Sequence, residues 1–265
     1  MLDELAQFNK ARWEELAAAQ LEYARPWLDL DVATARQRVD PLGHLGDVTG
    51  KRLLCLGSGG GQQSAAFALL GAETTVLDLT ENQLAGDRLA AAHYGLPIRI
   101  EQGDMRDLSR FADDAFDIVY HGYSINFVPD PTVVFAQVAR VLTVGGSYFL
   151  QWHNPFTQTI DETSWDGQGY RIQRRYQDEE IPADNFAETN WIFEDTAGNP
   201  QSVAGPREFR HTLSTMINGL VQQGFQIIGC QEETTDEEKP EPGSWEHFKG
   251  VIAWILNLWT VYRPG

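Results

Sequence analysis

Short apolar runs and segments with helical periodicity alternate along most of this chain. Residues 52–56 form a short apolar run, the pattern of a buried parallel strand, and residues 62–70 predict a helix that Gly71 ends. Strands that alternate with helices in this way indicate an α/β fold with a mostly parallel sheet and helices on both faces. The alternation predicts helices also at 3–21, 81–94, 131–142 and 208–223, and strands at 74–77, 98–102, 116–120, 147–152, 225–231 and 254–262.

Local signals predict where several of these elements begin. Thr80 is a natural N-cap for the helix at 81–94, and Asp130 followed by Pro131 is the pair expected at a helix start. Gly145 and Gly146 predict a turn that leads into the strand at 147–152.

A glycine-rich turn, Gly57-Ser58-Gly59-Gly60-Gly61, follows the first of these strands directly. Glycines at such a turn let a ligand approach the backbone, and the helix after it would point free N–H groups at an anion. The strand at 74–77 ends in Asp78, 21 residues after Gly57, close to the spacing at which an acid reaches a ribose hydroxyl. The dinucleotide version of this motif needs a third glycine where the chain has Gln62, which argues against NAD.

The run Cys-Leu-Gly-Ser-Gly-Gly-Gly at 55–61 resembles the first motif of the class I (Rossmann-like) S-adenosylmethionine-dependent methyltransferases, acid-x-Gly-x-Gly-x-Gly. Cys55 stands where most of that family has an acid, so the contact of that acid must be absent or supplied otherwise. The longer run CLGSGGGQQS looks like a bacterial, small-molecule subgroup of the family. The resemblance implies a seven-stranded, mostly parallel Rossmann-like sheet whose last strand is antiparallel, S-adenosylmethionine as cofactor, and S-adenosylhomocysteine as product.

The resemblance also implies which residues bind the cofactor. In the family an acid after the third strand bonds the adenine amino group and the next residue packs on the ring, roles carried over here to Asp104 and Met105; a mere turn at Asp104 is the alternative. The full set of expected cofactor residues is Gly57, Ser58, Gly59, Gln62, Gln63, Asp78, Leu79, Asp104, Met105 and His121.

The loop after the strand at 116–120, residues 121–127, leaves the sheet beside the glycine turn and should face the acceptor. A histidine there would serve as a base only if the acceptor loses a proton during transfer; otherwise orientation suffices, and we expect positioning rather than base catalysis. The catalytic candidates are His121, Tyr123, His153 and His211, and the substrate candidates are Tyr23, Asn126, Phe127, Trp152 and Trp191.

Residues 154–206 interrupt the α/β alternation and are rich in aromatic side chains. They are too long for an ordinary connection, and the family often places its substrate pocket in such an insertion. We expect a substrate cap with a strand pair at 171–177 and 190–194; a minicore that only packs itself is the alternative. Residues 1–50 are expected to form a helical lid, residues 51–153 the cofactor half of the sheet, and residues 207–265 the last helix and strands.

Charge and composition exclude several partners. Acids outnumber bases 38 to 20 and the net charge is −18, which argues against nucleic acid and against an anionic membrane surface. Two cysteines, no signal-peptide pattern and no long apolar run predict a soluble, cytoplasmic protein. No cluster of acids with metal-binding spacing occurs, so no metal is predicted, and the oligomeric state is left open.

Two functions from different classes fit these observations. The first is transfer of a methyl group from S-adenosylmethionine to a small-molecule acceptor, and the second is a non-catalytic domain that binds this cofactor as a sensor or scaffold. Cys55 keeps the second open, whereas the aromatic insertion favours the first.

Overall fold

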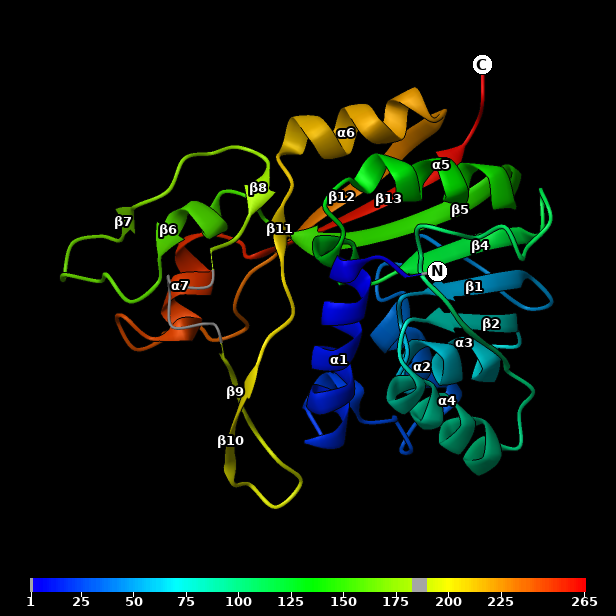
Figure 1. The fold of residues 1–265 in the computed structure, drawn as a ribbon, viewed down its shortest axis with the longest axis horizontal. Coiled ribbons are helices and arrows are strands. Elements are labelled where there is room, and N and C mark those ends of the chain that lie inside the picture. The colour runs from blue at the N-terminus through cyan, green and yellow to red at the C-terminus, as the bar shows by residue number, and fades with distance from the viewer. Residues whose placement is uncertain (1, 183–189) are drawn as a thin grey trace.

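The computed structural model of this protein describes residues 2–182 and 190–265. Its centre is a seven-stranded sheet in the order β12-β13-β5-β4-β1-β2-β3 (Figure 1). Strand β13 alone in this sheet runs antiparallel to both of its neighbours, which confirms the predicted fold class. The strands are β1 (Arg52–Leu56), β2 (Glu73–Asp78), β3 (Arg99–Gln102), β4 (Phe116–His121), β5 (Leu142–His153), β12 (Phe225–Glu233) and β13 (Ile255–Tyr262).

Helices cover both faces of the sheet and bury two apolar cores (Figure 1). One core lies under α5 and α6, and the other lies under α2, α3 and α4. Helix α1 lies beside the end of the sheet at which the parallel strands terminate (Figure 1). The helices are α1 (Glu4–Ala18), α2 (Val32–Val39), α3 (Gln63–Leu69), α4 (Glu81–Tyr94), α5 (Pro131–Val141), α6 (Leu213–Gln222) and α7 (Trp245–Val251).

Several predicted boundaries need correction. Strand β5 begins at Leu142 and includes Gly145 and Gly146, where a turn was predicted. The pairing with β4 is irregular here, since Phe116 pairs with Leu142 and Ile118 with Ser147, and Gly145 has a φ of +85°. Helix α6 begins at Leu213 rather than at 208, because Thr212 caps it and Phe209–Arg210 form the short strand β11. Helices α2 and α7 were not predicted.

The insertion folds as short antiparallel pairs, but the predicted pairing of 171–177 with 190–194 is wrong. Strand β7 (Arg171–Ile172) pairs with β6 (Ile160–Asp161), and β9 (Asn190–Glu194) pairs with β10 (Pro200–Ala204). The third pair joins β8 (Glu179–Glu180) to β11. Residues 183–189 of the predicted cap lie outside the described residues.

Helices α2 and α7 each pack against another part of the chain. Helix α7 follows residue 206 yet packs on the cap, where His247 Nδ1 lies 2.8 Å from the Tyr170 hydroxyl and its ring contacts Trp165. Within residues 1–50, α2 packs into the core with α3 and α4, so only the part before it can cover the site. Among the helices of residues 2–182 and 190–265, none is long and apolar enough to span a membrane.

Candidate active site

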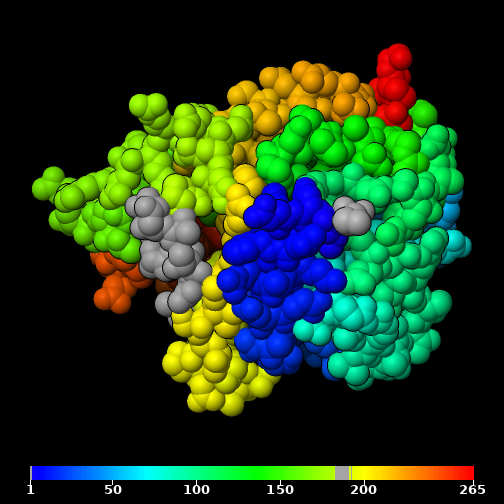
Figure 2. Space-filling view, viewed as in Figure 1, coloured from blue at the N-terminus to red at the C-terminus, as the bar shows by residue number. Residues whose placement is uncertain are grey.

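A cavity of about 940 Å³ lies between the ends of the parallel strands, α1 and the cap. Figure 2 shows α1 on this face of the molecule, between the cap segments and the sheet half. The predicted site residues that line the cavity are Gly57, Ser58, Gly59, Gln62, Gln63, Asp78, Leu79, Asp104, Met105, Tyr123, His153, Tyr23, Phe127 and Trp191.

The glycine turn after β1 lies close to its neighbours and leaves no room for side chains. A Cβ on Gly57, whose φ is +56°, would lie 2.7 Å from Met105 Cε, and a Cβ on Gly59 would lie 2.9 Å from Asp78 Cγ. Contacts below 3.0 Å of this kind do not occur in real structures without a shift of the neighbour. The turn therefore offers bare backbone to the cavity, as a cofactor that approaches the main chain requires.

Asp78 lies at the end of β2 against this turn. One carboxylate oxygen accepts the Gly59 N–H at 2.9 Å, and the other accepts the backbone N–H and the hydroxyl of Thr80, both at 2.9 Å. Burial raises the pKa of Asp78, and these hydrogen bonds oppose that rise. A carboxylate has about four lone-pair sites, so Asp78 retains acceptor capacity for a ribose diol. The turn and Asp78 fit the expected cofactor.

Gln62 connects the glycine turn to the N-terminal segment. Its side-chain amide donates to the carbonyls of Glu22 and Arg25 at 3.0 and 2.9 Å. Helix α1 of the same segment contacts α4, because the Glu14 carboxylate accepts the backbone N–H groups of Glu81 and Asn82 at the start of α4. Glu14 therefore accepts the free N–H groups at the start of α4, which the Thr80 side chain was expected to cap. The Thr80 hydroxyl donates to Asp78 instead. The segment before α2 is held over the cavity from both sides.

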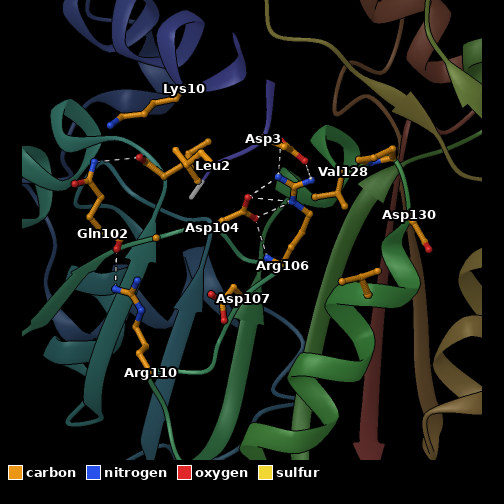
Figure 3. Close-up of a pocket in the computed structure, with 14 residues that line it drawn as sticks. Leu2, Asp3, Lys10, Gln102, Asp104, Arg106, Asp107, Arg110, Val128 and Asp130 are labelled. Atoms are coloured by element: carbon orange, nitrogen blue, oxygen red, sulfur yellow. Dashed lines mark hydrogen bonds and ion pairs between the residues drawn. The ribbon is translucent and has the colours of Figure 1, made fainter. Parts of the chain in front are cut away.

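The expected adenine end of the cavity carries an ion-pair network (Figure 3). The Arg106 guanidinium contacts Asp104 at 2.6 Å and Asp3, which caps α1, at 2.7 Å. The hydrogen bond from Arg106, followed by that from the Ala6 N–H, lowers the pKa of Asp3 to about 2. Asp104 therefore holds the start of α1 through Arg106, in addition to facing the cavity beside Met105.

The loop after β4 presents Tyr123 in a strained conformation. Its φ of +39° is rare for a bulky residue, and such strain persists only where surrounding contacts impose it. Asn126 supplies two of these contacts: its amide donates to the Tyr123 carbonyl at 2.7 Å, and its side-chain oxygen accepts the His153 N–H at 3.3 Å. Asn126 does not line the cavity; it supports the loop.

Tyr123 and His153 form a pair across the cavity wall. The Tyr123 hydroxyl lies 3.2 Å from His153 Nδ1, and the side-chain amide of Gln158 lies 3.1 Å from the same nitrogen. Burial, assisted by the positive charge of Arg210, lowers the pKa of His153 to about 3, so the imidazole is neutral across the physiological range. Burial also raises the pKa of Tyr123 well above its ordinary value.

Besides Asn126, three predicted residues lie outside the cavity, which corrects the expectation that the loop and strand ends all face it. His121 is fully buried in the core, with Nδ1 2.9 Å from the Tyr148 hydroxyl, and burial lowers its pKa to about 3. His211 is buried with Nε2 3.3 Å from the Ile125 carbonyl oxygen. Trp152 packs in the core under α5 and α6.

Aromatic rings from three separate segments meet at the cavity. Trp13 of α1 contacts Phe127 at 5.3 Å and Trp191 of β9 at 5.4 Å between ring centroids. Trp254, just before β13, lies 6.3 Å from Tyr123 and 5.7 Å from His153. The cavity is thus bounded by aromatic rings from the helix that covers it, from the loop and from the cap.

Sequence reasoning missed part of the cavity wall, including Trp254 and two polar residues of the sheet. Gln151 of β5 and Glu233 of β12 both line the cavity, and their side chains are hydrogen bonded at 3.0 Å. No local signal marks Glu233 and Trp254, because β13 must pair with β5 and β12 before these residues reach the cavity.

The sequence is similar to those of known methyltransferases. Residues 54–150 match the methyltransferase domain family. The chain is 34% identical over 190 residues to the uncharacterized methyltransferase YbaJ of Bacillus subtilis, with 70% of each chain covered. It is 29% identical over 153 residues to the ubiquinone biosynthesis O-methyltransferase of Xanthomonas oryzae pv. oryzae, a match that covers 58% of this chain and 60% of that one.

The fold has counterparts among solved structures. The crystal structure of an S-adenosylmethionine-dependent methyltransferase from Mesorhizobium loti matches with a TM-score of 0.66 and 24% identity, over 89% of this chain and 100% of that one. This likeness concerns the fold, whereas the relationship to YbaJ extends over more than two thirds of both sequences. The chain therefore belongs to the class I S-adenosylmethionine-dependent methyltransferases and uses S-adenosylmethionine as its cofactor.

Proposed function

We propose that the protein transfers the methyl group of S-adenosylmethionine to a small-molecule acceptor by in-line displacement. One observation carries this proposal: the glycine turn, Asp78 and the aromatic rings of the cap line the same cavity. Cofactor and acceptor would therefore share one enclosed space. The ubiquinone biosynthesis O-methyltransferase of Xanthomonas oryzae, a relative of this chain, supports a small-molecule acceptor here as well.

The cofactor, when bound, supplies an activated methyl group on a sulfonium, so the protein has to orient and enclose the reactants. We assign the cofactor end to Gly57, Ser58, Gly59, Asp78 and Met105. Tyr123 and Trp254 lie at the next part of the cavity, where an aromatic face would stabilise positive charge by about 0.5–2 kcal/mol per ring. The aromatic wall beyond them favours an acceptor with apolar, planar surface.

Positioning explains the loop after β4 better than base catalysis does. Among the described histidines, His153 lines the cavity, and with a pKa of about 3 it is a weak base. Its Nδ1 is already approached by Tyr123 and Gln158. We assign Tyr123 and His153 to holding the acceptor in line, and α1 to covering the site as a lid. An acceptor that is already ionised, or that carries no proton on the reacting atom, suits such a site.

A non-catalytic cofactor sensor is the weaker reading. A sensor would need only the cofactor end of the cavity, whereas this cavity continues past Tyr123 to Trp191 and Trp254. The curated relatives are methyltransferases, which supports an enzyme.

Calorimetry of cofactor binding tests the proposal. The unaltered protein should bind S-adenosylhomocysteine and not NAD. Replacing Asp78 by alanine should weaken S-adenosylhomocysteine binding by about 1.5–3 kcal/mol, the scale of hydrogen bonds to a charged group. Thermal melting checks that the variant folds. Tighter binding of NAD than of S-adenosylhomocysteine, or unchanged affinity in a folded Asp78→Ala protein, would contradict this assignment.

A second prediction concerns the cap. Trp191→Ala removes the ring that joins β9 to Trp13 and Phe127, so acceptor turnover should fall by about 10-fold or more, the scale of one lost aromatic anchor. S-Adenosylhomocysteine affinity should change much less, because Trp191 belongs to the cap and the glycine turn to the sheet. Tyr176→Ala, which removes an exposed cap ring outside the cavity, is the matched control. Equal loss of cofactor binding and turnover would argue against a separate acceptor end.

A further inference from the structure

A buried carboxylate, Asp87, lies behind the glycine turn and takes no part in the site described so far. Asp87 belongs to α4 and is 0% exposed. One of its oxygens accepts the Gly60 N–H at 3.1 Å, and the other accepts a short hydrogen bond from the Ser64 hydroxyl. The carboxylate therefore joins α4 to the turn and to the first turn of α3.

Helix α4 reaches the turn because Gly86 precedes Asp87. A Cβ on Gly86 would lie 2.6 Å from the Gly60 carbonyl oxygen and 2.8 Å from its carbon, so the helix and turn backbones are in direct contact. The Gly60 N–H also lies 3.0 Å from the Gln83 carbonyl oxygen of the same helix. Two acceptors of α4 thus converge on one N–H group of the turn.

Burial of the Asp87 carboxylate lowers the stability of the folded protein, which indicates a functional role for this acid. Within residues 2–182 and 190–265, Asp87 is held by hydrogen bonds and not by an ion pair, and burying an unpaired carboxylate is unfavourable. Burial raises the pKa of Asp87 to about 7, although the bonds from Ser64 and Gly60 oppose this. The other titratable groups that face it are Asp78 at the end of β2 and Cys55 of β1, both charge-coupled to it.

Cys55 is the complement of Asp87. The thiol is fully buried, and both its burial and the charge of Asp87 raise its pKa, so it stays neutral beside the acid. Cys55 occupies the place at which the first-motif pattern has an acid. Leu84 and Ala90, one turn before and after Asp87 on α4, pack in the same core as Cys55. Two carboxylates in this buried region would repel each other, so an acid can stand on β1 or on α4, but not favourably on both.

We propose that Asp87 is a positioning residue for the cofactor, which supplies from α4 the carboxylate that the end of β1 lacks at Cys55. It fixes the Gly60 N–H and thereby the conformation of the turn, in which Gly60 and Gly61 have φ values of +113° and +75°. The inference rests on the assignment of this turn to S-adenosylmethionine in the proposed function.

Asp87→Asn tests the role directly. An asparagine oxygen can still accept the Gly60 N–H, and its amide can donate to the Ser64 hydroxyl, which is both donor and acceptor, so this change removes the negative charge but keeps the hydrogen bonds. S-Adenosylhomocysteine affinity, measured by calorimetry at about pH 8, should fall roughly 5- to 10-fold, because a charge-assisted hydrogen bond to the turn becomes a neutral one. Adding Cys55→Asp, which places a carboxylate on β1 in the core that α4 covers, should restore affinity to within about twofold of the unaltered protein. Asp40→Asn, at a buried acid that accepts the Leu45 N–H far from the turn, should leave affinity unchanged.

Thermal melting separates positioning from mere structural support. The stability contributed by Asp87 is present below the ordinary aspartate pKa and is lost as the pH rises through about 7, because the folded protein favours the protonated form. Asparagine is neutral at every pH, so the Asp87→Asn protein does not lose this stability as the pH rises. The melting temperature of Asp87→Asn at about pH 8 should therefore be unchanged or higher than that of the unaltered protein, while cofactor affinity falls.

Each outcome decides between the two roles. Asp87→Asn that binds S-adenosylhomocysteine as the unaltered protein does, or a loss that Cys55→Asp does not restore, would overturn the inference. If Asp87→Asn does not fold, Ser64→Ala decides: a severalfold loss of affinity supports the role of Asp87, and unchanged affinity overturns it. Absence of binding by the unaltered protein would instead overturn the proposed function, and this inference with it.

Discussion

Gly86→Ala should lower both stability and cofactor affinity, although alanine in place of glycine usually stabilises a helix. The usual gain is about 1 kcal/mol, because alanine loses less backbone entropy on folding. At Gly86 the new Cβ would lie 2.6 Å from the Gly60 carbonyl oxygen, and backbone cannot move aside as a flexible side chain can. Overpacking of this kind costs about 1–3 kcal/mol, so we expect net destabilisation of about 1 kcal/mol.

The effect on the cofactor should be larger than the effect on stability. Helix α4 must retreat from the turn, and Asp87 then loses the Gly60 N–H. S-Adenosylhomocysteine affinity should fall roughly 30-fold or more, by loss of a charge-assisted hydrogen bond together with a displaced turn. Urea unfolding and calorimetry measure the two quantities.

Gly219→Ala is the matched control for this variant. Gly219 is a buried helical glycine of α6, and a Cβ there would lie 3.1 Å from two carbons of the Phe135 ring, in the core under α5 and α6. This change should alter stability while leaving cofactor affinity within about twofold, because the site is remote from the turn. A Gly86→Ala protein that is stabilised and binds normally would show that the turn and α4 are not rigidly coupled.

The sequence predicted the first half of the fold well because its signals are local. The strand β1 has its predicted bounds and β2 is one residue longer at each end than expected, since a short apolar run between glycines allows few alternatives. Asp78 and the glycine turn belong to one continuous motif, so their proximity follows from the strand order. The strand pairing of the cap was predicted wrongly. Strand β6 pairs with β7 and β9 with β10, all within the insertion, and strands as short as the two residues of β6 and β7 carry no periodic pattern.

One error in the site could have been avoided by strand alternation. Trp152 and His153 are consecutive in β5, so their side chains point to opposite faces of the sheet. His153 lines the cavity, and Trp152 packs in the core. Gln151, two residues before His153, shares its face and lines the cavity as well. Glu233 and Trp254 are different, because only the pairing of β13 with β5 and β12 brings them there.

The pH dependence of turnover should distinguish positioning from base catalysis at the Tyr123–His153 pair. His153 has a pKa lowered to about 3, so it takes up a proton only under strongly acidic conditions. Between about pH 5 and pH 8 its protonation is constant, so at saturating S-adenosylmethionine, where the titration of Asp87 does not limit the rate, turnover should stay level apart from the titration of the acceptor itself. Turnover is measured as release of S-adenosylhomocysteine with acceptors from a panel of small aromatic compounds.

Tyr123→Ala should then lower kcat/KM by about 100-fold, because a misplacement of about 1 Å has an effect of this size. Tyr123→Phe keeps the ring, loses the hydroxyl near His153, and should cost only a few fold. Both losses should be independent of pH, and cofactor affinity should stay within a few fold. His153→Gln tests the alternative, with His93→Gln at an exposed position of α4 as its control. An acidic limb near pH 6 to 7 that the His153 change removes and the His93 change leaves in place would assign His153 as a general base, because a histidine with a near-ordinary pKa loses its proton there.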